Sequence, residues 1–144
     1  MIALLLSLVM LCVCTACSGM KFKEQVAMDN EDLLFTITNI DTENEDYFKM
    51  NFQVENYSDM ELVCDIFDVC VNGNDYDELC TISVDAEETE DGALRFYYED
   101  CLEEYGEERA TKITFTLEVY DGEDYDSLYE TQVTVYPYGE RAAK

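Results

Sequence analysis

The chain has 144 residues, of which 34 are acidic and 8 are basic, so its formal net charge is −26, and it contains neither His nor Trp. This charge excludes nucleic acid as a partner, because binding to phosphates depends on Lys and Arg side chains that displace counterions. The absence of His excludes Ser-His-Asp and Cys-His catalytic groups and most zinc sites. Hydrophobic residues make up 48% of the chain and alternate with polar ones, so we expect a folded domain rather than a disordered acidic chain.

Residues 2–16 are uncharged and almost wholly apolar, which is typical of the hydrophobic region of an export signal. A membrane-spanning helix needs about 20 apolar residues, and this run ends earlier, at Ser18 and Gly19. Small residues precede Cys17, and residues 13–18 resemble the lipobox of bacterial lipoproteins. The resemblance implies cleavage before Cys17, a lipid on its sulfur, and a location at the outer face of the cell membrane. Secretion after an ordinary signal-peptidase cut at the same bond is the alternative.

Removal of residues 1–16 leaves 128 residues, the length of one domain. We expect a lipid-anchored tether at residues 17–30, the folded domain at residues 31–138 and a C-terminal tail at residues 139–144. The removed part carries no charge, so the mature chain keeps the full −26. The acidic side chains are therefore expected on solvent faces and turns, where they maintain solubility at some cost in mutual repulsion.

Alternation of apolar and polar residues predicts seven or eight short strands. The clearest is at residues 47–55, where Phe48, Met50, Phe52 and Val54 share one face. The other expected strands lie at residues 33–40, 62–71 (as one or two strands), 81–84, 94–98, 111–120 and 129–136, with a weak one at residues 25–28.

Two local patterns predict connections between these strands. Asn72-Gly73 supplies the left-handed positions of a tight hairpin. Residues 99–106 predict a helical turn or two, with acidic residues at its start, Leu102 facing inward and Gly106 at its end. The succession of short strands and turns is typical of an antiparallel β-sandwich of immunoglobulin-like type, although the Cys-Trp-Cys hallmark of antibody domains is missing.

Four segments occur in a characteristic order: Asn56-Tyr57-Ser58-Asp59, Val71-Asn72-Gly73, residues 102–106 and residues 113–121. In this order they resemble the landmarks of uncharacterised immunoglobulin-like modules exported by anaerobic Gram-positive bacteria. The segments are turns and core strands. The resemblance therefore implies an immunoglobulin-like fold over about residues 33–137 and supplies no active-site residue.

Four cysteines follow Cys17 in the mature chain, namely Cys64, Cys70, Cys80 and Cys101. An even number in an exported domain favours at least one disulfide among three arrangements. The alternative is that they are small core residues that stay reduced in an anoxic habitat. A zinc site is disfavoured, because the spacings contain no C-x-x-C pair.

Acidic loops are expected at residues 41–46, 75–78 and 121–126. If such loops meet at one end of a sandwich, their oxygens can hold Ca²⁺, which takes six to eight oxygen ligands. No loop matches an EF-hand, and solvated turns are the alternative explanation. The candidate residues for binding a cation or a partner are Asp75, Asp77, Asp121, Asp124, Tyr125 and Asp126.

These patterns predict a lipoprotein whose sandwich is a non-catalytic interaction or accessory module that needs no cofactor. A Ca²⁺-dependent or glycan-binding module is the alternative, since nine of the eleven tyrosines lie beyond Cys70 and can form a face that stacks on sugars. A paired-carboxylate hydrolase is a third class, disfavoured by short loops that leave little room for a cleft. Apart from the membrane, the expected partner is a basic protein, a basic peptide or a glycan, with contact where Tyr125 lies between Asp124 and Asp126.

Overall fold

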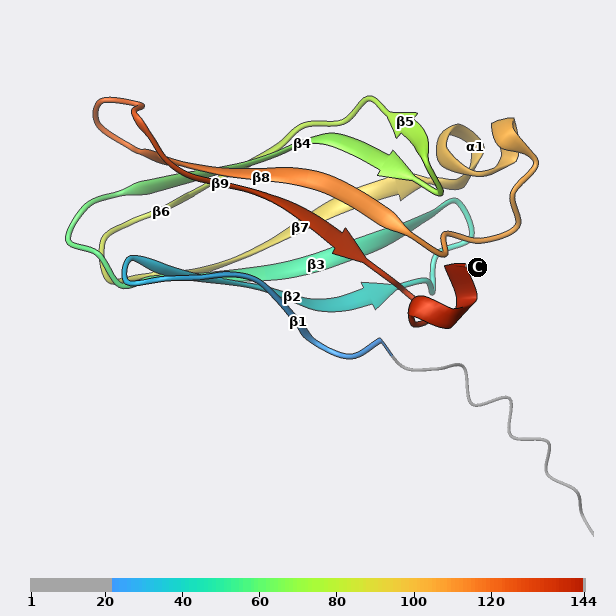
Figure 1. The fold of residues 1–144 in the computed structure, drawn as a ribbon, viewed down its shortest axis with the longest axis horizontal. Helices are drawn as coiled ribbons and strands as arrows, with labels where there is room; N and C mark the ends of the chain where they lie inside the picture. The colour runs from blue at the N-terminus through green and yellow to red at the C-terminus, as the bar shows by residue number, and fades with distance from the viewer. Residues whose placement is uncertain (1–21, 144) are drawn as a thin grey trace, which may run out of the picture.

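The computed structural model describes residues 22–143, so Cys17 and the expected signal peptide lie outside the described residues. Nine strands form two antiparallel sheets that face each other across one core (Figure 1). The first sheet has the order β1 (Gln25–Asp29), β2 (Leu33–Asp41), β3 (Tyr47–Asn56) and β7 (Thr89–Tyr97). In the second, β4 (Leu62–Val71) pairs with β8 (Ile113–Asp121), which pairs with β9 (Ser127–Val135). Two short strands, β5 (Asn74–Tyr76) and β6 (Cys80–Val84), pair with the other edge of β4.

The chain changes sheet after β3, after β6 and again after β7. The order β2-β3-β7 opposite β4-β8-β9 matches strands A-B-E and C-F-G of immunoglobulin-type sandwiches. The prediction of an all-β immunoglobulin-like sandwich with one short helix is confirmed. No helix among residues 22–143 is long and apolar enough to cross a membrane.

Several predicted boundaries differ from the structure. The segment at residues 62–71 is one strand, in which Asp68 adopts a left-handed φ of 50° at a bulge against β8. Residues 25–29 are paired in the first sheet, so the domain begins before residue 31, its expected first residue. Part of the expected tail forms a 3-10 helix, η2 (Glu140–Ala143).

Strand β7 begins at Thr89, five residues before its predicted start at Leu94. Acidic residues and Gly92 make this half of the strand resemble a turn. Gly92 pairs with Phe52 of β3, and a Cβ at this position would overlap the Phe52 ring. The glycine is therefore required by a cross-strand aromatic contact, which the chain's local sequence does not reveal.

The core is built from the inward faces of both sheets, and aromatic rings occupy its centre. Phe35 and Phe52 stack at 4.9 Å between centroids, and Phe48 and Phe96 stack at 4.6 Å. All four side chains are at most 2% exposed. Burial of one such side chain contributes about 1.5–3 kcal/mol, so these stacked rings supply cohesion that a Trp provides in antibody domains.

The buried side chain of Asn56 joins two of the crossings between sheets. Its amide nitrogen donates to the carbonyl oxygens of Met60 (2.8 Å), Val84 (3.0 Å) and Asp85 (3.1 Å). Its oxygen accepts from the backbone N–H and the hydroxyl of Ser58. These hydrogen bonds hold the β3–β4 connection against the β6–β7 connection.

Replacement of Asn56 by Ala should lower the free energy of unfolding by about 3 kcal/mol, because it removes five hydrogen bonds and deprives the buried carbonyl oxygen of Val84 of the Asn56 donor. Asn44→Ala is the matched control: its side chain accepts from Asp46 N–H in an exposed loop, so the expected loss is under about 1 kcal/mol. Urea denaturation of both variants measures the difference. Equal losses would show that the Asn56 amide does not hold the crossings together.

Candidate functional site

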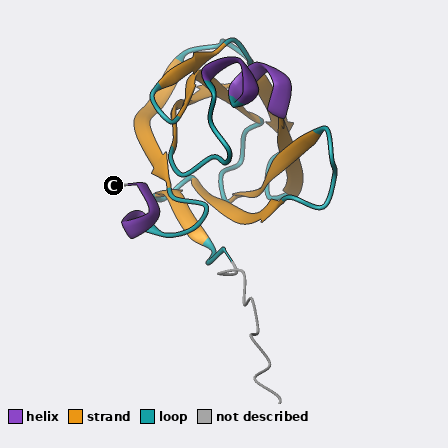
Figure 2. Cartoon of the chain, turned by 90° about the vertical axis from the view of Figure 1, so that its right-hand side faces the viewer, coloured by secondary structure: helices purple, strands orange, loops and turns teal. Residues whose placement is uncertain are grey.

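One end of the sandwich is covered by the helical segment that follows β7 (Figure 2). It consists of α1 (Tyr98–Cys101) and the 3-10 helix η1 (Glu103–Tyr105). Leu102 between them is 2% exposed, and Gly106 ends the segment with a left-handed φ of 70°. The predicted helical turn, its inward leucine and its terminal glycine are confirmed.

Hydrogen bonds place this segment between two others that are distant in sequence. The backbone N–H of Tyr98 donates to the carbonyl oxygen of Asp46 in the β2–β3 loop at 3.0 Å. The hydroxyl of Tyr76, on β5, donates to the carbonyl oxygen of Arg95 at 3.1 Å and accepts from the N–H of Tyr97 at 3.2 Å. The end of β5, the β2–β3 loop and α1 therefore form one continuous surface.

Two adjoining hollows on this surface are lined by carboxylates. The hollow beside η1, of about 330 Å³, is lined by Asp75, Tyr76, Asp77, Glu78, Asp100, Glu104 and Tyr105. The hollow beside α1, of about 420 Å³, is lined by Glu45, Asp46, Tyr97, Tyr98, Glu99, Asp100 and Glu103. Each has five acidic residues and they share Asp100, so nine carboxylates and no Lys or Arg line what we call the α1 surface.

The carboxylates of the α1 surface are not neutralised by neighbouring cations. The one ion pair among residues 22–143 joins Lys49 to Asp41 at 3.4 Å, outside the two hollows. Tyr97 and Tyr105 lie beside the acidic residues and are 39% and 44% exposed. Unpaired carboxylates next to exposed phenol rings suit an Arg or Lys side chain, which pairs with the former and stacks on the latter.

The structure brings only some of the predicted site residues together. Asp75 and Asp77 line the hollow beside η1, although Asp75 belongs to β5 rather than to a loop. Asp121, Asp124, Tyr125 and Asp126 lie in or next to the β8–β9 connection, at the opposite end of the sandwich (Figure 1). The three acidic loops therefore do not all meet at one end, which was the condition for a shared Ca²⁺ site, because β4 and β8 are antiparallel and the turns that follow them lie at opposite ends.

In the β8–β9 connection, the Asp121 carboxylate closes the turn by accepting from the N–H groups of Glu123 (2.7 Å) and Asp124 (3.3 Å). Tyr125 adopts a left-handed φ of 58° and is 68% exposed. The predicted contact residue thus projects into solvent. No group of three or more His, Cys, Asp or Glu is placed to hold a metal ion within the described part of the chain.

Sequence reasoning did not select Glu99, Asp100, Glu103 and Glu104, which form much of the α1 surface. Acidic residues are frequent along the whole chain, so their local density distinguishes no segment. The pattern of residues 97–105 could nevertheless have indicated an acidic surface. The inward Leu102 leaves the acidic side chains and two tyrosines on the outer side of the same helical turn.

The four mature cysteines that the structure describes are free thiols. Cys64 pairs across strands with Ile82, and Cys80 pairs with Ile66, so the two cysteines are diagonal neighbours on β4 and β6. Diagonal neighbours have Cα atoms about 7–8 Å apart, and such a distance cannot be bridged without backbone movement. The expected disulfide is therefore absent from this arrangement, and the alternative of reduced core residues fits Cys64 and Cys101, which are both buried.

Burial raises the pKa of Cys64 to about 12 and that of Cys101 to about 11. Because the thiolate is the reactive form, both should react with iodoacetamide at pH 8 at least about tenfold more slowly in the native protein than in urea. Peptide mapping by mass spectrometry measures both rates. Equal rates, or a disulfide-linked peptide containing Cys64, would contradict the buried-thiol assignment.

Comparison with known proteins identifies no family. No family model matches the sequence, and no match is found among curated proteins. Among solved structures, the chain is similar to beta-glucuronidase 2 of Bacteroides uniformis, covalently bound to cyclophellitol-6-carboxylate aziridine, with a TM-score of 0.38 and 8% identity. The match covers 81% of this chain and 13% of that enzyme. At this TM-score the similarity carries no functional argument.

Proposed function

We propose that the protein is a lipoprotein held at the outer face of the cell membrane through Cys17, and that its sandwich is a non-catalytic module that binds a basic protein or peptide. The anchoring is supported by the apolar run at residues 2–16 and by the lipobox-like residues 13–18. A two-chain lipid gives stable attachment to a membrane. The sandwich would then act as a recognition domain close to the cell surface.

The α1 surface is the observation that carries the binding proposal. Exposed charges act over a Debye length of about 8 Å at physiological salt, so evenly spread acidic residues attract a partner only weakly. Nine carboxylates around two adjoining hollows concentrate negative charge on one surface. The exposed rings of Tyr97 and Tyr105 add contacts that favour an Arg-rich partner over small cations.

Replacement of Cys17 by Ala should release the protein from membranes into the medium, because it removes the sulfur to which the lipid is attached. Cys14→Leu is the control, since Leu is the usual lipobox residue at that position and anchoring should persist. Fractionation of cells and medium followed by immunoblotting measures the distribution. Membrane association of the Cys17→Ala protein would refute the lipoprotein assignment.

Neutralisation of the α1 surface should slow binding of a basic probe. Glu103→Gln together with Glu104→Gln should lower the association rate constant for an oligo-arginine peptide about threefold at low salt, because charged groups near a binding site control electrostatic steering. Asp124→Asn together with Asp126→Asn removes the same charge at the opposite end and should have a smaller effect. Stopped-flow measurements over a range of salt concentrations compare the two pairs.

An equal decrease for both pairs would show that only the total charge matters. A larger decrease for the pair at Asp124 and Asp126 would place the binding surface at the β8–β9 connection. Thermal stability should change little in either variant, because exposed charges contribute little to the fold. Melting curves therefore separate an effect on binding from an effect on folding.

A further inference from the structure

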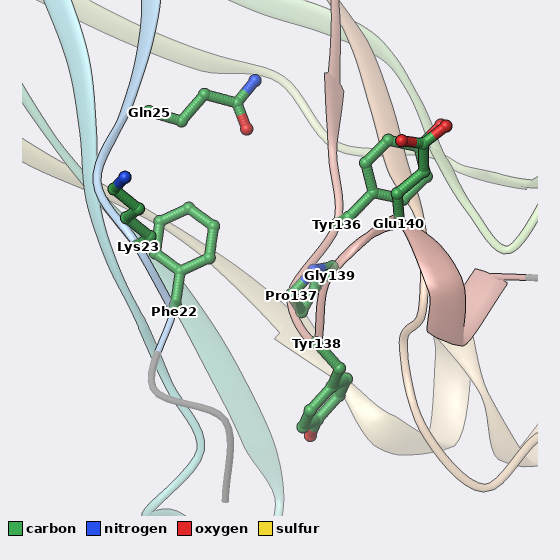
Figure 3. Close-up of a pocket in the computed structure, with 8 residues that line it drawn as sticks. All are labelled: Phe22, Lys23, Gln25, Tyr136, Pro137, Tyr138, Gly139 and Glu140. Carbon is green, nitrogen blue, oxygen red and sulfur yellow. The ribbon is translucent and has the colours of Figure 1, made fainter.

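A groove of about 330 Å³ lies between the segment that enters β1 and the segment that leaves β9. Figure 3 shows the ring of Phe22 on one side and those of Tyr136 and Pro137 on the other. Tyr138 also lines the groove, and the Arg109 guanidinium lies 4.9 Å from the centre of its ring. Aromatic and apolar groups thus form most of this surface.

Side-chain hydrogen bonds hold the two walls of the groove in place. The Gln25 amide of β1 donates to the carbonyl oxygen of Thr134 of β9 at 2.8 Å. Further along the same seam, the Tyr129 hydroxyl donates to the Asp32 carboxylate. The Gln25 bond joins the edge strands of the two sheets beside the groove and so fixes the groove's position in the domain.

The segments around the groove carry far less negative charge than the rest of the chain. Residues 22–24 and 136–143 contain two basic residues, Lys23 and Arg141, and two acidic residues, so their net charge is zero. Residues 25–135 contain 4 basic and 32 acidic residues, a net charge of −28. The two segments that form the groove therefore add no net repulsion from an anionic surface.

The groove also lies close to the proposed anchor. Phe22 is the fifth residue after Cys17, and a fully extended chain spans at most about 3.6 Å per residue, or about 18 Å in all. The bilayer on which Cys17 is held is thus within reach of Phe22. In the end view of Figure 2, the chain enters β1 on the side of the end face opposite to α1.

We infer that this aromatic groove, formed by Phe22, Tyr136, Pro137 and Tyr138, is a membrane-docking surface that rests on the headgroup region of the bilayer. The inference rests on the proposed anchoring at Cys17. Tyrosine rings favour the membrane interface, and Lys23 and Arg141 attract lipid phosphates. The tether keeps the groove at a high effective concentration near the bilayer, so weak contacts are sufficient. Docking then directs the α1 surface away from the membrane.

The absence of Trp from the chain allows a direct test with single-Trp reporters. Phe22→Trp places a reporter in the groove, and Tyr125→Trp is the matched control at the opposite end. Each full-length lipoprotein is reconstituted into vesicles of brominated phosphatidylcholine with a minority of phosphatidylglycerol. Emission of the groove reporter should fall to about half its value in unbrominated vesicles, because interfacial groups enter about 5–10 Å into the headgroup and acyl boundary. Emission of the control should not change.

A third protein shows whether the tyrosines form the contact. Tyr136→Ser together with Tyr138→Ser, in the Phe22→Trp background, should abolish the quenching while vesicle flotation persists. Circular dichroism confirms that the fold is retained. Persistence of the quenching in this folded variant would overturn the docking surface as described.

The remaining outcomes separate the inference from the proposed function. Flotation with vesicles but quenching of neither reporter, or equal quenching of both, overturns the docking surface and leaves the anchor intact. Failure to float overturns both. A blue shift of the groove reporter that appears without vesicles and grows with protein concentration identifies a second copy of this chain as the occupant, and likewise overturns the inference.

Discussion

Repulsion among carboxylates is the constraint under which this sandwich forms. The chain carries a net charge of −26, and the described residues contain one ion pair, between Lys49 and Asp41. Like charges oppose a compact state, so cohesion has to come from buried apolar surface and from satisfied hydrogen bonds. The stacked pairs around Phe52 and Phe96 supply the first, and the buried amide of Asn56 supplies a central part of the second.

Because carboxylates repel one another, the uneven distribution of charge over the surface calls for a functional explanation. A protein that needed acidic residues only for solubility would gain from spacing them widely, since close carboxylates destabilise one another. The α1 surface instead places nine around two hollows and adds exposed tyrosine rings. Across the same end of the sandwich, the terminal segments form a groove with aromatic walls and no net charge. The proposed anchor, docking groove and binding surface are thus arranged in order from the membrane outward.

The sequence predicted those elements whose physical cause is local. Alternation along β3 and β8, the Asn72-Gly73 turn and the inward Leu102 each depend on neighbouring residues. The first half of β7 could not be predicted, because Gly92 is specified by the Phe52 ring on another strand. The α1 surface joins residues 45–46, 75–78 and 99–104, so its existence depends on the topology of the sheets. The β8–β9 connection lies at the end of the sandwich opposite to the α1 surface because β8 runs antiparallel to β4. The composition of a loop does not reveal the direction of the strand that precedes it.

An NMR titration of the protein with an oligo-arginine peptide at physiological salt shows directly whether the α1 surface is where a basic partner binds. Amide shifts report each segment separately and need no mutation. If the peptide binds there, as we propose, the largest changes occur at residues 97–105, with smaller ones at residues 45–46 and 75–78. Changes concentrated at residues 121–126, or spread over the surface in proportion to the number of nearby acidic residues, would contradict this proposal.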